Sequence, residues 1–261
     1  MRLTAPFLAV SFGALAYRYK PTSFNMFNPA LAYCQAGVDY TKYPDRFSTI
    51  NHIAIVKHLL SMLRDVDTDT PTFRRYSDRI MRLLIEEALS QELVVSKRKS
   101  PTGSEYDHYG INNSDFAAVS IMRGGDSMLG EVFDMIPGVG IGKVLIQRDE
   151  STKDKTPVFY YAKLPEDIAS KRRVFLLDPM CATGGSAAMC IQKLVDSGVK
   201  EENITFISLI TCDRGISKVM DDFPKIRMLT AAVDPVLNEQ RYIIPGLGDF
   251  GDRFFGSKLP K

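Results

Sequence analysis

The stretch that decides the fold is Val174-Phe175-Leu176-Leu177-Asp178-Pro179-Met180-Cys181-Ala182-Thr183-Gly184-Gly185-Ser186. Its first four residues are apolar and predict a buried parallel strand, which ends at the acid Asp178. A loop of small residues follows, and a helical pattern begins near Ser186. A strand that runs through Thr-Gly-Gly-Ser into a helix is typical of an anion site, because backbone N–H groups and the positive end of the helix dipole face the ligand. The acid before the loop suggests a phosphate attached to a hydroxyl-bearing group such as ribose.

Strands and helices alternate on both sides of this stretch. Apolar runs predict strands at residues 116–122, 143–148, 173–178, 204–210 and 226–233. Apolar residues at helical spacing predict helices at residues 50–64, 73–93, 128–135, 186–197 and 216–222. Thr72 is a candidate N-cap of the second helix, and Gly198 ends the fourth. This order predicts an α/β fold with a central parallel sheet flanked by helices, in which ligands bind beyond the carboxyl ends of the strands.

Two further segments have no helical pattern. Residues 97–115 are polar and rich in Ser, Gly and Asn, which predicts a long loop or an irregular hairpin. The strand at 143–148, a charged turn at 149–155 and a second run at 156–163 together predict a β-arm. No shift in composition marks a second domain. We therefore expect an N-terminal extension over residues 1–25 and a single domain over residues 26–261.

Charge and cysteine content exclude several classes of protein. The chain has 33 basic and 31 acidic residues, a balance that argues against a nucleic-acid partner. The cysteines form no CxxC pair and no histidine cluster accompanies them, so we expect neither a zinc site nor a disulfide framework. Because no histidine is near it in sequence, Cys181 is interpreted as a small loop residue rather than a nucleophile. The cysteines are Cys34, Cys181, Cys190 and Cys212.

The N-terminal residues bear on the compartment. Residues 5–17 are mostly apolar and are flanked by Arg2 and Arg18. This run is too short to span a bilayer, and it fits a targeting segment, a disordered extension, or translation upstream of a true start at Met26. Because the cysteine usage fits a reducing compartment, we expect a cytoplasmic protein with no membrane partner. Targeting of the first 25 residues to an organelle is the alternative.

Two arginines follow predicted strands near the anion loop. The segment Ser120-Ile121-Met122-Arg123-Gly124-Gly125-Asp126-Ser127-Met128 places Arg123 directly after a strand, where its guanidinium can form charge-assisted hydrogen bonds with a diphosphate. Arg148 stands at the end of the next strand. Taken alone, Arg123 is equally compatible with a solvated surface arginine, and Arg148 with a charged hairpin turn.

The C-terminal stretch Tyr242-Ile243-Ile244-Pro245-Gly246-Leu247-Gly248-Asp249-Phe250-Gly251-Asp252 contains two misleading matches. Three of its glycines fit GxGxxG, but only ten residues follow, too few for a dinucleotide-binding βαβ unit. Asp249-Phe250-Gly251 fits the kinase DFG motif, but the other kinase signatures are absent. The glycines instead suit a loop whose main chain approaches a ligand closely.

Together these segments, from about Tyr76 to Gly256, resemble the type I phosphoribosyltransferases. The pair Asp178-Pro179, where most relatives have two acids, and the C-terminal stretch are similar to those of the uracil phosphoribosyltransferases. The resemblance implies the type I phosphoribosyltransferase fold, with a β-arm and a C-terminal base-binding hood. It also implies that uracil reacts with phosphoribosyl diphosphate (PRPP) to give UMP and pyrophosphate in pyrimidine salvage. Mg²⁺ would be carried by PRPP, without metal ligands from the protein.

The resemblance assigns roles to individual residues. Residues 182–186 would bind the 5-phosphate, Asp178 the ribose hydroxyls, and the segment around Arg123 the pyrophosphate. The implied catalytic residues are Asp249, Arg123 and Arg148. The implied PRPP-binding residues are Arg123, Gly124, Gly125, Arg148, Asp178, Pro179, Met180, Cys181, Ala182, Thr183, Gly184, Gly185, Ser186 and Asp249. The implied uracil-binding residues are Met180, Ala182, Tyr242, Ile243, Gly248, Asp249 and Phe250.

Two functional alternatives accompany this reading. One is a phosphoribosyltransferase for another base, and the other is an inactive protein of the same fold that senses PRPP or a nucleotide. Gly124 stands where the family has Ala and is the one departure in the predicted site. If the protein were inactive, Gly124 would be the first residue to suspect. The resemblance also implies a homodimer or homotetramer, with the β-arm as a dimer contact, and a GTP activator. Arg79 is a candidate GTP ligand, but Thr72 and Gly140 stand where some relatives have basic residues, which weakens that case.

Overall fold

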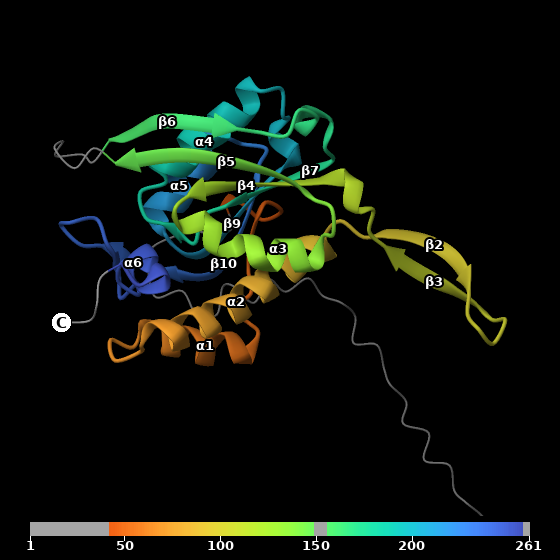
Figure 1. The fold of residues 1–261 in the computed structure, drawn as a ribbon, viewed down its shortest axis with the longest axis horizontal. Coiled ribbons are helices and arrows are strands. Elements are labelled where there is room, and N and C mark those ends of the chain that lie inside the picture. Colours follow the sequence, from red (N-terminus) through yellow and green to blue (C-terminus); the bar gives the residue numbers. More distant parts are fainter. Residues whose placement is uncertain (1–41, 149–155, 258–261) are drawn as a thin grey trace, which may run out of the picture.

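The computed structural model describes residues 42–148 and 156–257. A mostly parallel sheet lies at its centre, and helices cover both faces (Figure 1). The expected N-terminal extension over residues 1–25, Cys34 and the charged turn at 149–155 lie outside the described residues.

The central sheet confirms the predicted strand pattern. Its order is β1-β10-β9-β7-β4-β5-β6, and β8 also pairs with β9. Every neighbouring pair is parallel except β5 and β6, which are antiparallel. All residues of β7 and β9 are buried, as expected for strands covered on both faces. The strands are β1 (Phe47–Thr49), β4 (Phe116–Met122), β5 (Gly140–Arg148), β6 (Pro157–Lys163), β7 (Arg173–Leu177), β8 (Met180–Cys181), β9 (Ile204–Cys212) and β10 (Arg227–Asp234).

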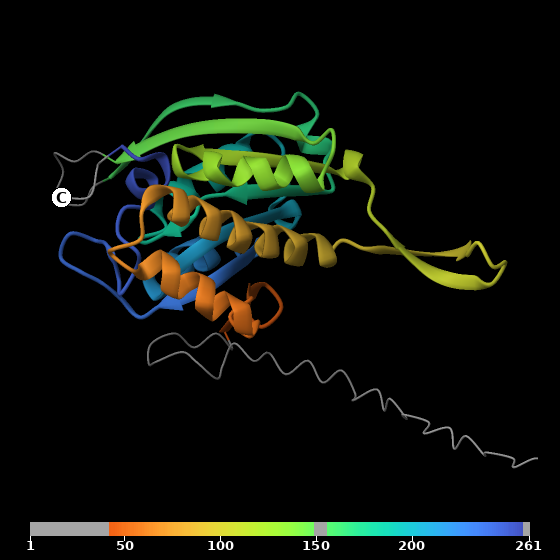
Figure 2. The same cartoon turned by 60° about the horizontal axis from the view of Figure 1, so that its bottom comes forward.

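Two apolar cores lie on opposite faces of this sheet. Helices α1, α2, α3 and α6 contribute to one core, and α4 and α5 contribute to the other. Figure 2 shows α1, α2 and α3 packed side by side on their face. The helices are α1 (Ala54–Arg64), α2 (Thr70–Ser90), α3 (Leu129–Met135), α4 (Gly185–Asp196), α5 (Asp213–Asp222) and α6 (Phe250–Phe255). Short 3₁₀ helices are η3 (Asn113–Asp115), η4 (Gly124–Met128), η5 (Ile168–Ser170) and η6 (Glu201–Asn203).

The start of α2 corrects one predicted cap. The helix begins at Thr70, and its N-cap is Asp69, whose carboxylate accepts a hydrogen bond from the backbone N–H of Thr72 at 2.8 Å. The prediction of Thr72 as the N-cap was therefore wrong. It overlooked that Pro71 fits in the first turn of a helix, where the N–H that proline lacks would have no partner in the helix.

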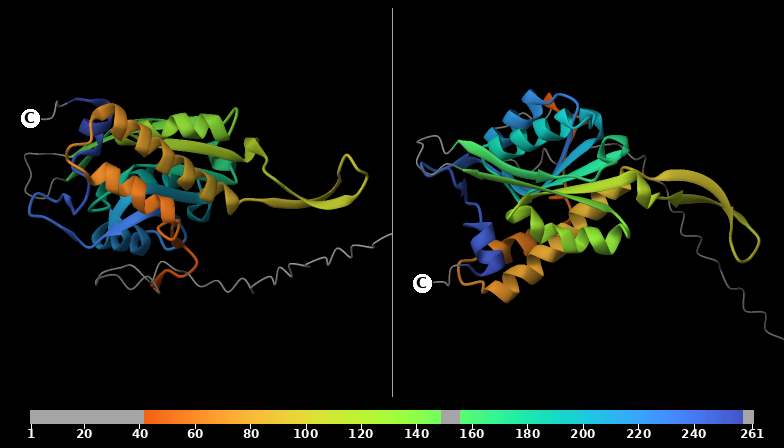
Figure 3. Two further views of the ribbon diagram at one scale, coloured as in Figure 1. Left: turned by 90° about the horizontal axis from the view of Figure 1, so that it is seen from below. Right: turned by 45° about the horizontal axis from the view of Figure 1, so that its top comes forward.

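The segment expected as a loop or irregular hairpin is a regular antiparallel hairpin. Its strands β2 (Val94–Lys99) and β3 (Glu105–Gly110) extend away from the body of the molecule (Figure 3). The predicted pairing of residues 143–148 with 156–163 is present as β5 and β6. These two strands form the edge of the central sheet, because β5 also pairs with β4 along most of its length. The projecting arm is therefore β2–β3.

Two short strands precede the last helix. β11 (Val236–Leu237) pairs with β12 (Ile243–Ile244) in an antiparallel ladder, and α6 follows. We call residues 234–257, which contain both strands and α6, the hood. Its side chains Ile243, Leu247 and Phe250 are buried in the same core as α1 and α2. The hood is thereby fixed to the body at the carboxyl end of the sheet.

Candidate active site

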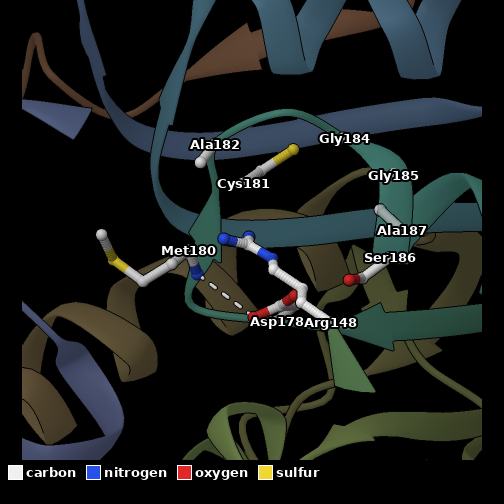
Figure 4. A pocket seen from close by; sticks show the side chains of 9 residues that line it. All are labelled: Arg148, Asp178, Met180, Cys181, Ala182, Gly184, Gly185, Ser186 and Ala187. Carbon is white, nitrogen blue, oxygen red and sulfur yellow. Dashed lines mark hydrogen bonds between the residues drawn. The ribbon is translucent and has the colours of Figure 1, made fainter. Parts of the chain in front are cut away.

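The predicted anion loop lines a small pocket at the carboxyl ends of the central strands (Figure 4). All of the lining residues except Ala187 are among the residues predicted from the sequence. Of the other predicted loop residues, Pro179 is buried and Thr183 is half-buried in the same loop. The lining residues are Arg148, Asp178, Met180, Cys181, Ala182, Gly184, Gly185, Ser186 and Ala187.

Backbone geometry makes this loop suitable for an anion. Gly184 is the N-cap of α4 and has a φ of +76°, a conformation that favours glycine. Among the residues that the structure describes, no side chain caps α4. The first N–H groups of the helix are therefore available to a ligand. A Cβ at Gly184 would also lie 2.9 Å from the backbone oxygen of Gly215, so space and conformation both require glycine.

Hydrogen bonds to the end of β9 hold the loop in place. The N–H of Ile210 donates to the carbonyl of Pro179 at 3.0 Å. Thr211 Oγ1 donates to the carbonyl of Cys181 at 3.0 Å, and Cys212 Sγ donates to the carbonyl of Ala182 at 2.9 Å. These supporting residues were not predicted. The Thr-Cys pair that ends β9, next to the predicted loop, is the signal that could have indicated them.

Burial changes the titration of two groups in the loop. It raises the pKa of Asp178 to about 7, although a hydrogen bond from the Met180 N–H and the nearby charge of Arg148 oppose this rise. Figure 4 shows the Arg148 side chain beside Asp178. Burial also raises the pKa of the Cys181 thiol to about 12. The thiol is therefore protonated at neutral pH, which supports its interpretation as a packing residue rather than a nucleophile.

The predicted diphosphate loop lies directly against the anion loop. The peptide bond between Met122 and Arg123 is cis. A Cβ added at Gly124 would lie 3.2 Å from the Pro179 ring, and one added at Gly125 would lie 2.2 Å from the backbone oxygen of Leu177. Both glycines are therefore brought next to the strand and loop that carry Asp178.

The Arg123 side chain extends to the hood. Its Nη2 donates to Asp252 Oδ1 at 3.0 Å, and its Nη1 donates to Ser257 Oγ at 2.7 Å. Its guanidinium carbon lies 5.4 Å from the centre of the Phe255 ring. None of these three partners was predicted from the sequence.

The hood carries the predicted base-binding residues other than Met180 and Ala182, which lie in the anion loop. Ala182, Ile243 and Phe250 are buried in one core, and Met180 packs against it. Asp249 is the N-cap of α6, and its Oδ1 accepts a hydrogen bond from the Asp252 N–H at 2.8 Å. Gly248 has a φ of +80°. Tyr242 differs from the others, because it is exposed on the β11–β12 hairpin.

A mostly buried ion pair that was not predicted from the sequence anchors the hood. Arg64 binds Asp234 through two hydrogen bonds of 2.8 and 2.6 Å. Asp234 also accepts from the Gly246 N–H at 2.8 Å, and Arg64 donates to the Gly246 carbonyl at 2.7 Å. An acid at the end of β10, as at the end of β7, was the available signal. The pair links α1, β10 and the turn before the base-binding stretch.

Asp178 is the one carboxylate among the described residues that line the pocket. In residues 42–148 and 156–257, no group of three or more His, Cys, Asp or Glu could hold a metal ion. Mg²⁺ usually takes one or two carboxylates together with phosphate oxygens rather than a full protein cage. Asp178, half-buried in the pocket, is a carboxylate of that kind.

Comparison with known proteins identifies close relatives of this chain. The model of the family "Uracil phosphoribosyltransferase" matches residues 50–257. The chain is 43% identical over 221 residues to uracil phosphoribosyltransferase from Dictyostelium discoideum, covering 83% of this chain and 99% of that protein. It is 48% identical over 198 residues to the Saccharomyces cerevisiae protein of the same name, covering 76% of this chain and 90% of that protein. The solved structure of AQ2163 protein from Aquifex aeolicus matches with a TM-score of 0.71 and 27% identity, covering 82% of this chain and 99% of that one.

Proposed function

The chain belongs to the uracil phosphoribosyltransferase family, and from that premise we propose that it converts uracil and PRPP to UMP and pyrophosphate in pyrimidine salvage. The observation that carries this proposal is the meeting of three segments at the carboxyl edge of one sheet. They are the anion loop with Asp178, the Gly124–Gly125 turn packed on it, and the hood beside Ala182. These segments supply a phosphate site, a diphosphate site and a base site.

The chemistry is a substitution at the ribose C1. The bond between uracil N1 and C1 forms, the bond between C1 and the pyrophosphate oxygen breaks with its electron pair, and N1 loses its proton. By analogy with glycosyl transfer, the transition state is oxocarbenium-like. The protein therefore needs no covalent nucleophile. It must align the substrates, neutralise the leaving group and exclude water.

Each predicted residue has a task in that scheme. The N–H groups at the start of α4 and the side chains of Thr183 and Ser186 bind the 5-phosphate. Asp178 accepts hydrogen bonds from the ribose hydroxyls. Arg123 and Arg148 neutralise the departing pyrophosphate. The Asp249 carboxylate stabilises the positive charge that develops on the ribose.

Main-chain groups of the hood recognise the base. Backbone atoms around Ile243, Gly248 and Phe250 form hydrogen bonds with the edge of uracil, while Met180 and Ala182 line its face. The positive φ of Gly248 supports this assignment, because it allows close approach of the main chain. Tyr242, exposed next to Ile243, would limit access to the base site.

Mg²⁺ accompanies PRPP in this proposal. When bound, it supplies charge neutralisation on the diphosphate. The Asp178 and Asp249 carboxylates would lie near it, while PRPP would carry it without a ligand from the protein. Titration of activity with Mg²⁺ in the presence of a chelator tests the requirement.

We expect a homodimer as the basic assembly, from which a homotetramer could form. The dimer contact predicted at the β-arm, now strands β5 and β6, stays a prediction, and the projecting β2–β3 hairpin is a second candidate contact. Val95 and Tyr109 of β2–β3 are 56% and 61% exposed, and they are direct partners in the ladder. A two-stranded hairpin with exposed apolar side chains is marginally stable alone and gains from covering by a partner. Light scattering of the purified chain, compared with a Tyr109→Lys variant, tests this assembly.

GTP activation and the compartment are two further parts of the proposal. Arg79 is exposed on α2 and lies over the ring of Tyr76, where it could bind an anionic effector. Thr72 and Gly140 provide no further positive charge, so any activation by GTP should be weak. Within the described part of the chain, no helix is long and apolar enough to cross a membrane. We expect a cytoplasmic enzyme, with organelle import through residues 1–25 as the outcome that fluorescence microscopy of a tagged full chain would detect.

Release of pyrophosphate tests the proposed site. The purified chain with PRPP, Mg²⁺ and uracil should release pyrophosphate only when all three are present. Replacing Arg148 with Gln should lower this rate about 10- to 100-fold. An unchanged rate in Arg148→Gln would remove Arg148 from the site while leaving the reaction itself intact.

A further inference from the structure

The C-terminal end of the hood forms a three-sided contact around the guanidinium of Arg123. Asp252 Oδ1 lies 3.0 Å from Nη2, Ser257 Oγ lies 2.7 Å from Nη1, and the ring of Phe255 lies 5.4 Å from the guanidinium carbon. We call Asp252, Phe255 and Ser257 the arginine cradle. A lone surface ion pair would order an arginine weakly, but a carboxylate, a hydroxyl and a ring together fix the orientation of its plane.

The exposed fractions of the two charged side chains indicate that Asp252 supports Arg123, rather than the reverse. The Asp252 side chain is 16% exposed, whereas the Arg123 side chain is 52% exposed. The carboxylate is therefore part of the protein body, and half of the cation faces outward. An arginine has five N–H donors, and the cradle engages two of them. Three donors are left for a ligand.

The cradle also connects the two halves of the site. Arg123 precedes the glycine turn that packs on the anion loop, and the cradle lies on or just after α6, whose N-cap is Asp249. A Cβ at Gly251 would lie 3.0 Å from Arg123 Nη2 and 3.4 Å from Asp249 Oδ1. Both implied catalytic groups therefore approach the same turn of the hood.

We propose that Asp252, assisted by Ser257 and Phe255, is a positioning residue that holds Arg123 ready for the diphosphate of PRPP. This proposal rests on the proposed function, in which Arg123 binds that diphosphate. A guanidinium held before the substrate arrives needs little reorganisation when charge develops on the leaving pyrophosphate. Asp252 acts only through Arg123 and does not touch the substrate.

The test measures pyrophosphate binding and the kinetics of Asp252→Asn. We expect the inhibition constant of pyrophosphate and the KM for PRPP to rise about tenfold, with the KM for uracil within about twofold. Ser257→Ala should change the same constants in the same direction, by about threefold. Asp252→Glu should restore part of the loss, because it returns the carboxylate. Asp134→Asn, which alters a surface acid that also pairs with an arginine, is the matched control.

A double-mutant cycle with Arg123→Gln separates positioning from a general structural role. If Asp252 acts through Arg123, the double variant should bind pyrophosphate as weakly as Arg123→Gln alone. Additive losses would overturn the proposal. Tighter pyrophosphate binding in Asp252→Asn would also overturn it, because it would show that the carboxylate competes with the ligand for Arg123.

Direct calorimetry of pyrophosphate with Mg²⁺ keeps this test independent of turnover. If the chain made no UMP, the proposed function would fail, but the effect of Asp252→Asn on pyrophosphate affinity would still be measured. If Asp252→Asn lowered the melting temperature too far for use, Ser257→Ala would replace it in the cycle with Arg123→Gln. Equal pyrophosphate affinity in Ser257→Ala and the unmodified protein would then contradict the proposal.

Discussion

The anion loop and the hood face the same site but are built in different ways. The anion loop is formed by consecutive residues, and main-chain geometry at Gly184 defines it. The hood is held by side chains from distant elements, such as Arg64 of α1 on Asp234. The phosphate half of the site therefore depends on the space that glycines leave. The base half depends on a charged pair that can be removed without adding an atom.

This difference predicts which substitutions are harmful in each region. Added atoms should disrupt the anion loop and the turn behind it. Removed charges should disrupt the hood. Five substitutions or conditions test this division, beginning with the largest expected effect.

Gly125→Ala should have the largest effect. Its Cβ would lie 2.2 Å from the backbone oxygen of Leu177 and 2.9 Å from Ser120 Oγ, and the backbone cannot yield easily in the buried strand β7. We expect a loss of about 3 kcal/mol in the free energy of unfolding and at least about a 100-fold loss of activity. Urea denaturation and initial rates measure these effects.

Gly130→Ala is the matched control for that substitution. Gly130 lies in α3, and no atom comes within 4 Å of an added Cβ. It should stabilise the protein by about 0.5–1 kcal/mol and leave the rate unchanged. If Gly125→Ala behaved like Gly130→Ala, the close packing of the diphosphate loop on β7 would be contradicted.

Asp249→Asn should lower turnover by about 100-fold while changing uracil affinity little. Asparagine is as good an N-cap as aspartate, so α6 should keep its start and only the charge is lost. The measurements are kcat and the KM for uracil. Equal kcat in the variant would remove Asp249 from charge stabilisation and leave it a purely structural cap.

The anion loop and the hood differ in how much of each could be predicted from the sequence. The residues of the anion loop could be predicted because strand, loop and helix are contiguous and one local motif defines all three. The side-chain pairs between the hood and the rest of the chain could not be predicted, because Arg64 and Asp234 are 170 residues apart and Arg123 and Asp252 are 129 apart. No local pattern encodes such pairs. The predicted β-arm is a second example. The sequence predicted that its two strands pair, but the pairing of β5 with β4, which makes them the edge of the central sheet, involves a separate segment of the chain.

Asp234→Asn should loosen the hood without affecting the anion loop. The substitution removes the charge that compensates Arg64 in a mostly buried pair. Loss of one partner of such a pair typically lowers the free energy of unfolding by about 3 kcal/mol or more. We expect the KM for uracil to rise about tenfold and the KM for PRPP to change by less than about threefold. Equal increases in both constants would show that the two regions are not separable.

The pH dependence of PRPP binding tests the anion loop alone. Because burial raises the pKa of Asp178 to about 7, the folded protein binds this proton more tightly than the unfolded chain does. Its contribution to stability therefore decreases as pH rises from about 4 to about 7. Binding of the ribose hydroxyls needs the carboxylate, so PRPP affinity should increase up to about tenfold from about pH 6 to about pH 8.

Asp178→Asn controls for titration of the phosphates of PRPP. Calorimetry of both proteins over this pH range should show that the ratio of their affinities changes with pH. A constant ratio would mean that Asp178 does not titrate there or does not contact the ribose.

Gly124→Ala should have the smallest effect. Its Cβ would lie 3.2 Å from the Pro179 ring, a tight contact with a side chain rather than with backbone. Small movements can relieve it, so activity should stay within about threefold of the unmodified protein. A large loss would show that this chain has adapted its diphosphate loop to glycine. A large gain would show that Gly124 impairs the loop.

The most direct test of the whole account is product formation from PRPP and Mg²⁺ with one base at a time. Uracil, hypoxanthine, orotate and no base would be compared, and the nucleotide formed would be identified by mass spectrometry. We expect UMP from uracil and no nucleotide in the other three reactions. A nucleotide from another base would contradict the assignment of the hood. No product from any base, with PRPP still bound, would contradict catalysis and indicate a PRPP sensor.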